Sequence, residues 1–159
     1  MTEAYIFDAI RTPRGKGRPD GSLHEVTSAR LSAGVLNDLK SRNNLEGHAV
    51  EDVIWGNVTQ VGEQGGCLAR TAVLASQLDQ SIPGLAINRF CASGMEAVNL
   101  AANQVKGGAG GAYIAGGDRR CPGRMHVCVR QRCLGCVVHR PQAPEHGGRP
   151  RRDAVAQGI

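Results

Sequence analysis

Hydrophobic and polar positions alternate between strand-like and helix-like patterns through the first 117 residues. Short β-rich runs occupy residues 4–10, 50–58, 84–90 and 112–117. Segments with helical character separate these runs and cover residues 24–43, 67–79 and 92–105. In the first helical segment, apolar residues recur roughly at helical spacing, which predicts that one face packs on a sheet. These residues are Val26, Leu31, Val35 and Leu39.

This order of elements predicts an α/β layered domain over residues 1–117, with a mostly parallel sheet covered by helices. The pattern ends after Gly117. Residues 118–159 contain nine Arg, no Lys, no aromatic residue and four of the six cysteines. Neither a helical nor a strand period persists there for more than a few residues. The sequence therefore predicts an irregular, disordered tail over residues 118–159.

Three interpretations of this tail remain open. Cysteines and histidines in it could ligate zinc: Cys121, Cys128, Cys133, Cys136, His126 and His139. Cys133 and Cys136 have the spacing of a zinc half-site, but Cys121 and Cys128 lie seven apart, so no metal site is predicted. The second interpretation is a disordered basic arm. The third is translation in a shifted frame, because GC-rich codons read out of register give Arg, Gly, Pro, Ala and Cys.

The net charge of +5 resides entirely in the tail. Residues 1–117 carry 10 Lys and Arg against 11 Asp and Glu, whereas residues 118–159 carry nine Arg against three acidic residues. A nucleic-acid-binding domain mixes basic residues into its folded surface, usually beside aromatic residues that stack on bases. The charge distribution therefore argues against a nucleic-acid partner.

The N-terminal residues carry Glu3 and Asp8 and lack a cationic start followed by an apolar stretch, so no secretion signal is predicted. No apolar run approaches the roughly 18 residues that a membrane span requires. We therefore expect a soluble cytoplasmic protein with reduced cysteines and no membrane partner.

Cys91 lies at a predicted strand-to-helix junction, in the sequence NRFCASG at residues 88–94. Free amides and the macrodipole at a helix N-terminus stabilise an anion, which favours a reactive thiolate. The small residues Ala92, Ser93 and Gly94 let a ligand or another backbone approach. Because a lone cysteine at such a junction can equally be inert core, these features by themselves leave both interpretations open.

Four stretches together resemble the N-terminal half of a thiolase, an acyl-CoA acetyltransferase. They are AYIFDAIRTPRGKG, VEDVIWGNVTQVGEQGGCLAR, INRFCASGMEAVNLAANQVKGG and AYIAGG. The resemblance covers about residues 3–117 and is most specific over residues 88–108, where Cys91 matches the cysteine that carries the acyl group. Ser93, Gly94 and Met95 match the same motif, and we expect them to serve packing.

The resemblance implies a two-step exchange through a cysteine acyl-enzyme. The Cys91 thiolate would attack a 3-ketoacyl-CoA, release acetyl-CoA and hold the shortened acyl group until free CoA removes it. The reverse direction would join acetyl units. The resemblance thus implies a role in fatty-acid metabolism, acyl-CoA and CoA as partners, coenzyme A as a substrate, no tightly bound cofactor, and a homo-oligomer in the intact family.

The resemblance breaks where a second thiolase half would begin. That half supplies a histidine in a Gly-His-Pro motif and a second cysteine in a Cys-x-Gly motif, and no histidine here has that setting. Cys121 and Cys133 fit Cys-x-Gly as strings, but their position directly after the first half suggests chance matches. We therefore expect a truncated chain that lacks the C-terminal domain and is inactive alone, or a non-catalytic subunit that pairs with another thiolase chain.

The missing half would also leave the helix after Cys91 uncovered. Its apolar residues are expected to form an exposed patch in the absence of a partner. They are Met95, Val98, Leu100, Ala101, Ala102 and Val105. A condensing ketoacyl synthase of the same fold is a further alternative, against which the GEQGGCLAR and NRFCASG stretches argue.

Overall fold

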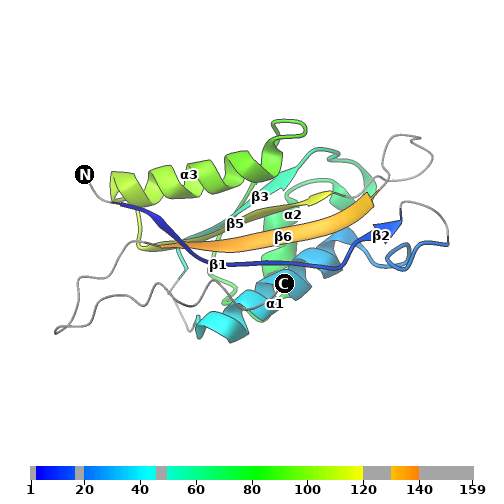
Figure 1. The fold of residues 1–159 in the computed structure, drawn as a ribbon, viewed down its shortest axis with the longest axis horizontal. Helices are drawn as coiled ribbons and strands as arrows, with labels where there is room; N and C mark the ends of the chain where they lie inside the picture. The colour runs from blue at the N-terminus through cyan, green and yellow to red at the C-terminus, as the bar shows by residue number, and fades with distance from the viewer. Residues whose placement is uncertain (1–2, 17–19, 46–49, 120–129, 140–159) are drawn as a thin grey trace.

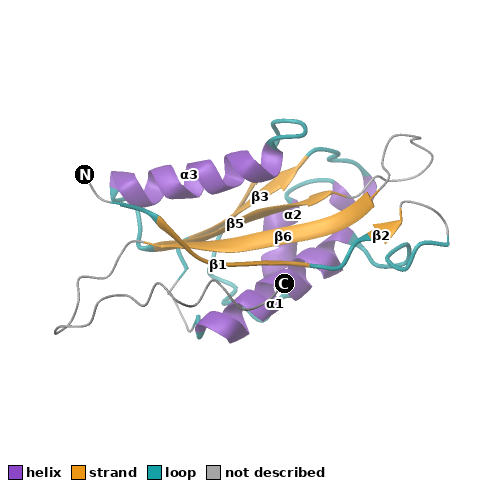
Figure 2. Ribbon diagram, in the orientation of Figure 1, coloured by secondary structure: helices purple, strands orange, loops and turns teal. Residues whose placement is uncertain are grey.

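The computed structural model describes residues 3–16, 20–45, 50–119 and 130–139, which form one sheet with helices on both faces (Figures 1 and 2). The strands are β1 Tyr5–Arg11, β2 Gly15–Lys16, β3 Asp52–Asn57, β4 Gly84–Ile87, β5 Ala112–Arg119 and β6 Arg130–His139. The helices are α1 Ser28–Asn43, α2 Leu68–Ala75 and α3 Ser93–Gly107, with a 3-10 turn η1 at Gly62–Gln64. The α/β layered fold predicted from the sequence is confirmed.

Four of the five longer strands run in the same direction. The sheet order is β1-β6-β5-β3-β4, and the short β2 also pairs with β6. β3 is parallel to β4 and β5, whereas β6 is antiparallel to both of its long neighbours, β1 and β5. The predicted mostly parallel sheet is therefore correct, with β6 as the strand that makes it mixed.

The prediction of an irregular tail from residue 118 is wrong for the described part of that segment. β5 continues to Arg119, and β6 lies in the interior of the sheet. Residues 133–138 form a continuous apolar run, which is typical of a strand covered on both faces and shows no alternation. Such a strand has no alternation of apolar and polar residues by which the sequence could reveal it. The zinc, disordered-arm and frame-shift interpretations of residues 120–129 and 140–159 lie outside the described residues.

Four elements are shorter than the sequence patterns predicted, among them β3, which spans Asp52–Asn57 instead of residues 50–58. α1 begins at Ser28 instead of residue 24, because Thr27 caps it through a hydrogen bond that its Oγ1 accepts from the Arg30 amide (3.2 Å). α2 ends at Ala75, where Ser76 donates through its hydroxyl to the Val73 carbonyl (2.8 Å). β4 ends at Ile87, and the residues after it form the turn before α3.

Two hydrophobic clusters cover the two faces of the sheet. On one face, Trp55 of β3 packs with apolar residues of α1 and α2, among them Leu36 and Leu39, and its indole donates to Ser32 Oγ (3.1 Å). The opposite face holds Ile54, the next residue along β3, against α3. Because both faces are covered, β3 is buried through most of its length.

The prediction for the apolar residues of α3 is partly wrong. Ala101 and Val105, expected in an exposed patch, are fully buried with Ala97 against the sheet. Their spacing of four places them on one helix face, and the small alanines let α3 approach the strands. Met95 is 65% exposed, while Val98 and Leu100 are half-buried. Among the described helices, none combines the length and apolar character that a bilayer crossing requires.

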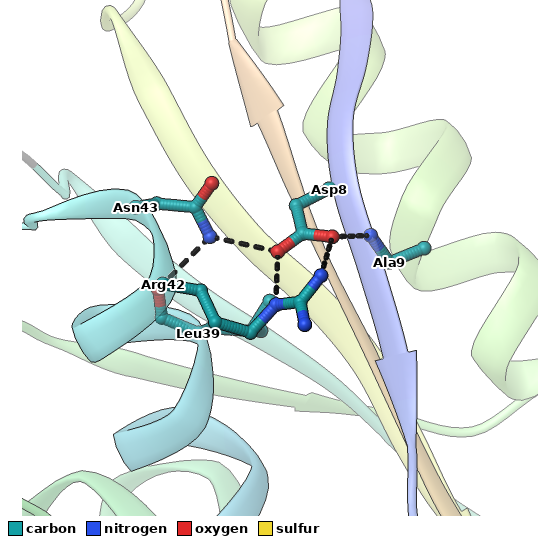
Figure 3. Close-up of polar contacts among 5 residues, drawn as sticks. All are labelled: Asp8, Ala9, Leu39, Arg42 and Asn43. Carbon is teal, nitrogen blue, oxygen red and sulfur yellow. Dashed lines mark hydrogen bonds and ion pairs between the residues drawn. The ribbon is translucent and has the colours of Figure 1, made fainter. Parts of the chain in front are cut away.

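A polar clamp joins β1 to the C-terminal end of α1 (Figure 3). Arg42 donates two hydrogen bonds to the Asp8 carboxylate, at 2.8 and 3.1 Å, and Asn43 donates a third at 3.0 Å. The hydrogen bonds from Arg42 are the main cause that lowers the pKa of Asp8 from its ordinary value of 3.8. The clamp thus fixes α1 against the edge strand.

Replacing Asp8 with Asn is expected to remove a pH-dependent contribution to stability. Because the folded-state pKa of Asp8 is lowered, this contribution is present above the unfolded pKa near 3.8 and is lost as the pH falls through the folded pKa. Urea denaturation of wild type and Asp8→Asn at neutral pH should differ by about 1 kcal/mol. The difference should shrink as the pH is lowered below about 3.8. If the free energies of unfolding of the two proteins differ by a constant amount through the acid range, this pH dependence does not come from Asp8.

Candidate functional site

Cys91 lies in the turn between β4 and α3, where the carboxyl ends of the parallel strands β3, β4 and β5 meet. Ligands of open α/β sheets bind outside these carboxyl ends. Cys91 is exposed, and α3 begins two residues later at Ser93. The predicted strand-to-helix junction is therefore confirmed, whereas the role of Cys91 as a nucleophile stays a prediction.

Backbone hydrogen bonds give this turn a tight shape. The Ala92 amide donates to the Arg89 carbonyl (3.0 Å), and the Ser93 amide donates to the Phe90 carbonyl (3.1 Å). Phe90 has φ +48°, in the left-handed region that non-glycine residues seldom adopt. The Phe90 side chain is exposed. Cys91 thus follows directly after an unusual backbone conformation.

Two side chains, one before and one after Cys91, form hydrogen bonds with the backbone around the same turn. Asn88 accepts from the Phe90 amide through Oδ1 (2.9 Å) and donates through Nδ2 to the Val58 carbonyl (3.1 Å), in the loop after β3. Ser93 accepts from the Arg89 amide through Oγ (2.8 Å) and donates to the Phe90 carbonyl (2.7 Å). Ser93 was expected to serve packing, and no role was predicted for Asn88. An Asn two residues before a turn amide is a frequent Asx turn, which is the signal that could have found it.

Glycines let the start of α3 lie against the sheet. A Cβ atom on Gly56 of β3 would lie 2.5 Å from the Ser93 carbonyl carbon and 2.6 Å from the Gly94 nitrogen. A Cβ on Gly117 of β5 would lie 2.8 Å from the Gly56 carbonyl oxygen. Only glycine permits these approaches, so the position of the Cys91 turn depends on the glycines of β3 and β5.

Polar groups surround the N-terminal end of α3. Arg89 forms an ion pair with Glu96 in the first turn of the helix (2.8 Å). Within the part of the chain that the structure describes, the Cys91 side chain forms no hydrogen bond or ion pair. Beneath the turn, the fully buried Asn57 donates to the Gln64 carbonyl (2.8 Å) and anchors the loop after β3. The thiol therefore projects from a fixed backbone with no side-chain partner among the described residues.

The other two cysteines whose side chains the structure describes form hydrogen bonds with the backbone. The half-buried Cys67 donates its thiol to the Gly84 carbonyl (3.2 Å), and the buried Cys136 donates to the Ala115 carbonyl (3.3 Å). Burial raises the pKa of the Cys136 thiol to about 11. Because this thiol is buried and already donates to the Ala115 carbonyl, its surroundings argue against Cys136 in the zinc interpretation. Cys121, Cys128 and His126 lie outside the described residues.

His139, another residue of the zinc interpretation, ends β6 with its ring near that of Phe7, with centroids 6.4 Å apart. Among the residues that the structure covers, no group of three or more His, Cys, Asp or Glu side chains is arranged to hold a metal ion.

Comparisons with known proteins identify the family. The family model for the thiolase N-terminal domain matches residues 4–125. A 3-ketoacyl-CoA thiolase of Klebsiella pneumoniae is 40% identical over 118 residues, which cover 74% of this chain and 30% of that protein. A 3-oxoadipyl-CoA/3-oxo-5,6-dehydrosuberyl-CoA thiolase of Escherichia coli K12 is 44% identical, over 74% of this chain and 29% of that protein. The chain spans about 30% of the length of these curated relatives. The chain belongs to the thiolase family.

Proposed function

We propose that this chain supplies the acyl-accepting nucleophile of a thiolase-type acyltransferase, and that Cys91 is this nucleophile. The observation that carries the proposal is the exposed Cys91 thiol at the carboxyl ends of the parallel strands, at the start of α3. Membership of the thiolase family supports acyl-CoA as the substrate class. The relatives include both 3-ketoacyl-CoA and 3-oxoadipyl-CoA thiolases, and 3-ketoacyl-CoA is the substrate class that these names share.

In the degradative direction, the Cys91 thiolate attacks the keto carbon of a 3-ketoacyl-CoA. The bond between the α and β carbons breaks, and its electron pair goes to the α carbon, which takes up a proton as acetyl-CoA leaves. The shortened acyl group stays on Cys91 as a thioester. A CoA thiolate then attacks this thioester and releases a shortened acyl-CoA. CoA is therefore a substrate, and the proposal includes no tightly bound cofactor.

The base that activates Cys91 is proposed to come from outside the described residues. In support, no described side chain is hydrogen-bonded to this thiol. A positioned general base contributes about 10²- to 10⁴-fold to such a step. The chain by itself is therefore expected to form the acyl-enzyme slowly. A role in cytoplasmic fatty-acid metabolism, within a homo-oligomer, belongs to the same proposal.

Transfer of an acetyl group from acetyl-CoA to Cys91 tests the proposal. The full chain is incubated with acetyl-CoA, with and without the complementary C-terminal segment of a bacterial 3-ketoacyl-CoA thiolase. Peptide mass spectrometry then locates the acetyl group. We expect a hydroxylamine-sensitive acetyl group on Cys91 that forms at least about 100-fold faster when the segment supplies the base.

Two variants serve as controls for this experiment. Cys91→Ser should abolish the thioester, whereas Cys67→Ser, which removes the half-buried cysteine just before α2, should retain it. The proposal fails if Cys91 stays unmodified in a folded complex of the two segments, or if all cysteines are acetylated equally.

A non-catalytic role is the second candidate. The observation in its favour is that the chain spans about 30% of its curated relatives' length. In this role the chain would bind another thiolase segment without carrying an acyl group. Stable co-purification with the C-terminal segment, combined with an unmodified Cys91, would favour it over the enzymatic proposal.

A further inference from the structure

The Ser93 hydroxyl closes the turn that carries Cys91. Ser93 is 3% exposed, and its Oγ accepts from the Arg89 amide (2.8 Å) and donates to the Phe90 carbonyl (2.7 Å). Both partners precede Cys91 in the chain, whereas Ser93 follows it. One buried hydroxyl therefore joins the two sides of the turn, and it uses both its donor and its acceptor capacity to do so.

This closure holds a backbone conformation that does not persist by itself. Phe90 has φ +48°, which is uncommon for a bulky residue and unfavourable by itself. Such a conformation is retained when surrounding contacts determine it. The contacts here are the Ser93 hydroxyl and the Ser93 amide, both at the Phe90 carbonyl, and the Asn88 Oδ1 at the Phe90 amide.

The turn is also anchored to the sheet at both ends. On the helix side, the Ser93 backbone lies against Gly56 so closely that a Cβ there would come within 2.5 Å. On the strand side, Asn88 Nδ2 donates to the Val58 carbonyl in the loop after β3. Ser93 thus connects the strained residue before Cys91 to a helix whose position the sheet determines.

We propose that Ser93 is a positioning residue that fixes the direction of the Cys91 thiol at the start of α3. The inference rests on the proposed role of Cys91 as the nucleophile and adds the residue that orients it. Without the hydroxyl, Phe90 is expected to relax toward the right-handed region, and the backbone that carries the Cys91 thiol would change direction. A thiolate aimed away from the start of α3 would lose a favourable interaction with the helix N-terminus.

The test compares alanine substitutions at two serines, Ser93 and Ser76. Each serine hydroxyl donates to one backbone carbonyl and accepts from one backbone amide. Ser76 at the end of α2 donates to the Val73 carbonyl (2.8 Å) and accepts from the Leu78 amide (3.1 Å). Ser93→Ala and Ser76→Ala therefore remove hydrogen bonds of the same kind, and both should lower Tm, the buried Ser93 by more than the half-buried Ser76. In the full chain, the rate of iodoacetamide labelling is followed by peptide mass spectrometry at Cys91 and, as an internal reference, at Cys67.

The Cys91 labelling rate is expected to fall about two- to fivefold in Ser93→Ala and to stay unchanged in Ser76→Ala. General loosening would instead raise labelling at the half-buried Cys67, and we expect no such rise in either variant. Asn88→Ala, at an exposed position, removes the other contact to Phe90 and should lower the Cys91 rate as well. The Asn88→Ala protein tests the same turn if the Ser93→Ala protein fails to fold.

A Cys91 rate that stays at the wild-type value or rises in the folded variants would overturn the inference. Iodoacetamide labelling requires neither acetyl-CoA nor a second segment. An unmodified Cys91 in the acetyl-transfer experiment would therefore remove the proposed function, while the labelling comparison would still decide whether Ser93 positions the thiol.

Discussion

Gly56→Ala is expected to destabilise the fold by about 3 kcal/mol or more, because the new Cβ would meet backbone instead of a flexible side chain. It would lie 2.5 Å from the Ser93 carbonyl carbon and 2.6 Å from the Gly94 nitrogen. Helix α3 can avoid this overlap only by moving away from the sheet, which opens the cluster around Ala97 and Ala101. The same movement displaces Cys91, so acyl transfer to this residue should also fall.

Gly34→Ala is the matched control for this substitution. Gly34 lies in α1, and a Cβ there would have no neighbour within 4 Å. Alanine at this position should stabilise the helix by about 0.5 to 1 kcal/mol. Urea denaturation followed by circular dichroism measures both free energies of unfolding. A Gly56→Ala protein as stable as wild type would show that α3 does not lie against β3 as described.

Alkaline pH is expected to destabilise the fold through Cys136 of β6. Burial raises the pKa of this thiol from its ordinary value of 9.0 to about 11. The fold therefore favours the neutral thiol, and the stability that this provides is fully present below pH 9 and lost as the pH rises through 11. Since each pH unit between the two pKa values corresponds to about 1.4 kcal/mol, about 2 to 3 kcal/mol should be lost across this range.

Cys136→Ala and Cys67→Ala separate this effect from other alkaline titrations. Tyr113, whose pKa burial also raises, is present in both variants and in wild type, so its contribution cancels in the comparison. The free energy of unfolding of wild type and Cys67→Ala should fall together between pH 9 and 11, whereas Cys136→Ala should fall by about 2 to 3 kcal/mol less. Parallel curves for all three proteins would show that Cys136 is not buried in the sheet.

Sequence patterns predicted most of the elements that build the site. The strands β1, β3, β4 and β5 and the three helices were expected in their observed order, because each is a local run of apolar residues with a recognisable period. The resemblance around residues 88–108 singled out Cys91 and placed it between a strand and a helix, as observed. The family assignment from those motifs is confirmed over residues 4–125.

Other features could not be predicted, because they depend on residues that are distant in the chain. β6 lies between β1 and β5, and its continuous apolar run has no period that distinguishes it from a loop or a helix segment. Ala101 and Val105 are buried because α3 packs its small residues on the sheet, a choice between helix faces that α3 alone does not make. The contact of Asp8 with Arg42 likewise joins β1 to α1 across the fold.

The amino-acid sequence by itself determined where most strands and the three helices form, which family the chain resembles, and which cysteine precedes α3, since these follow from local patterns and a contiguous motif. Tertiary structure alone decided which strand lies inside the sheet and which face of α3 is buried. It also decided which side chains restrain the Cys91 turn. These outcomes result from packing and hydrogen bonding between segments that meet only after the sheet has assembled.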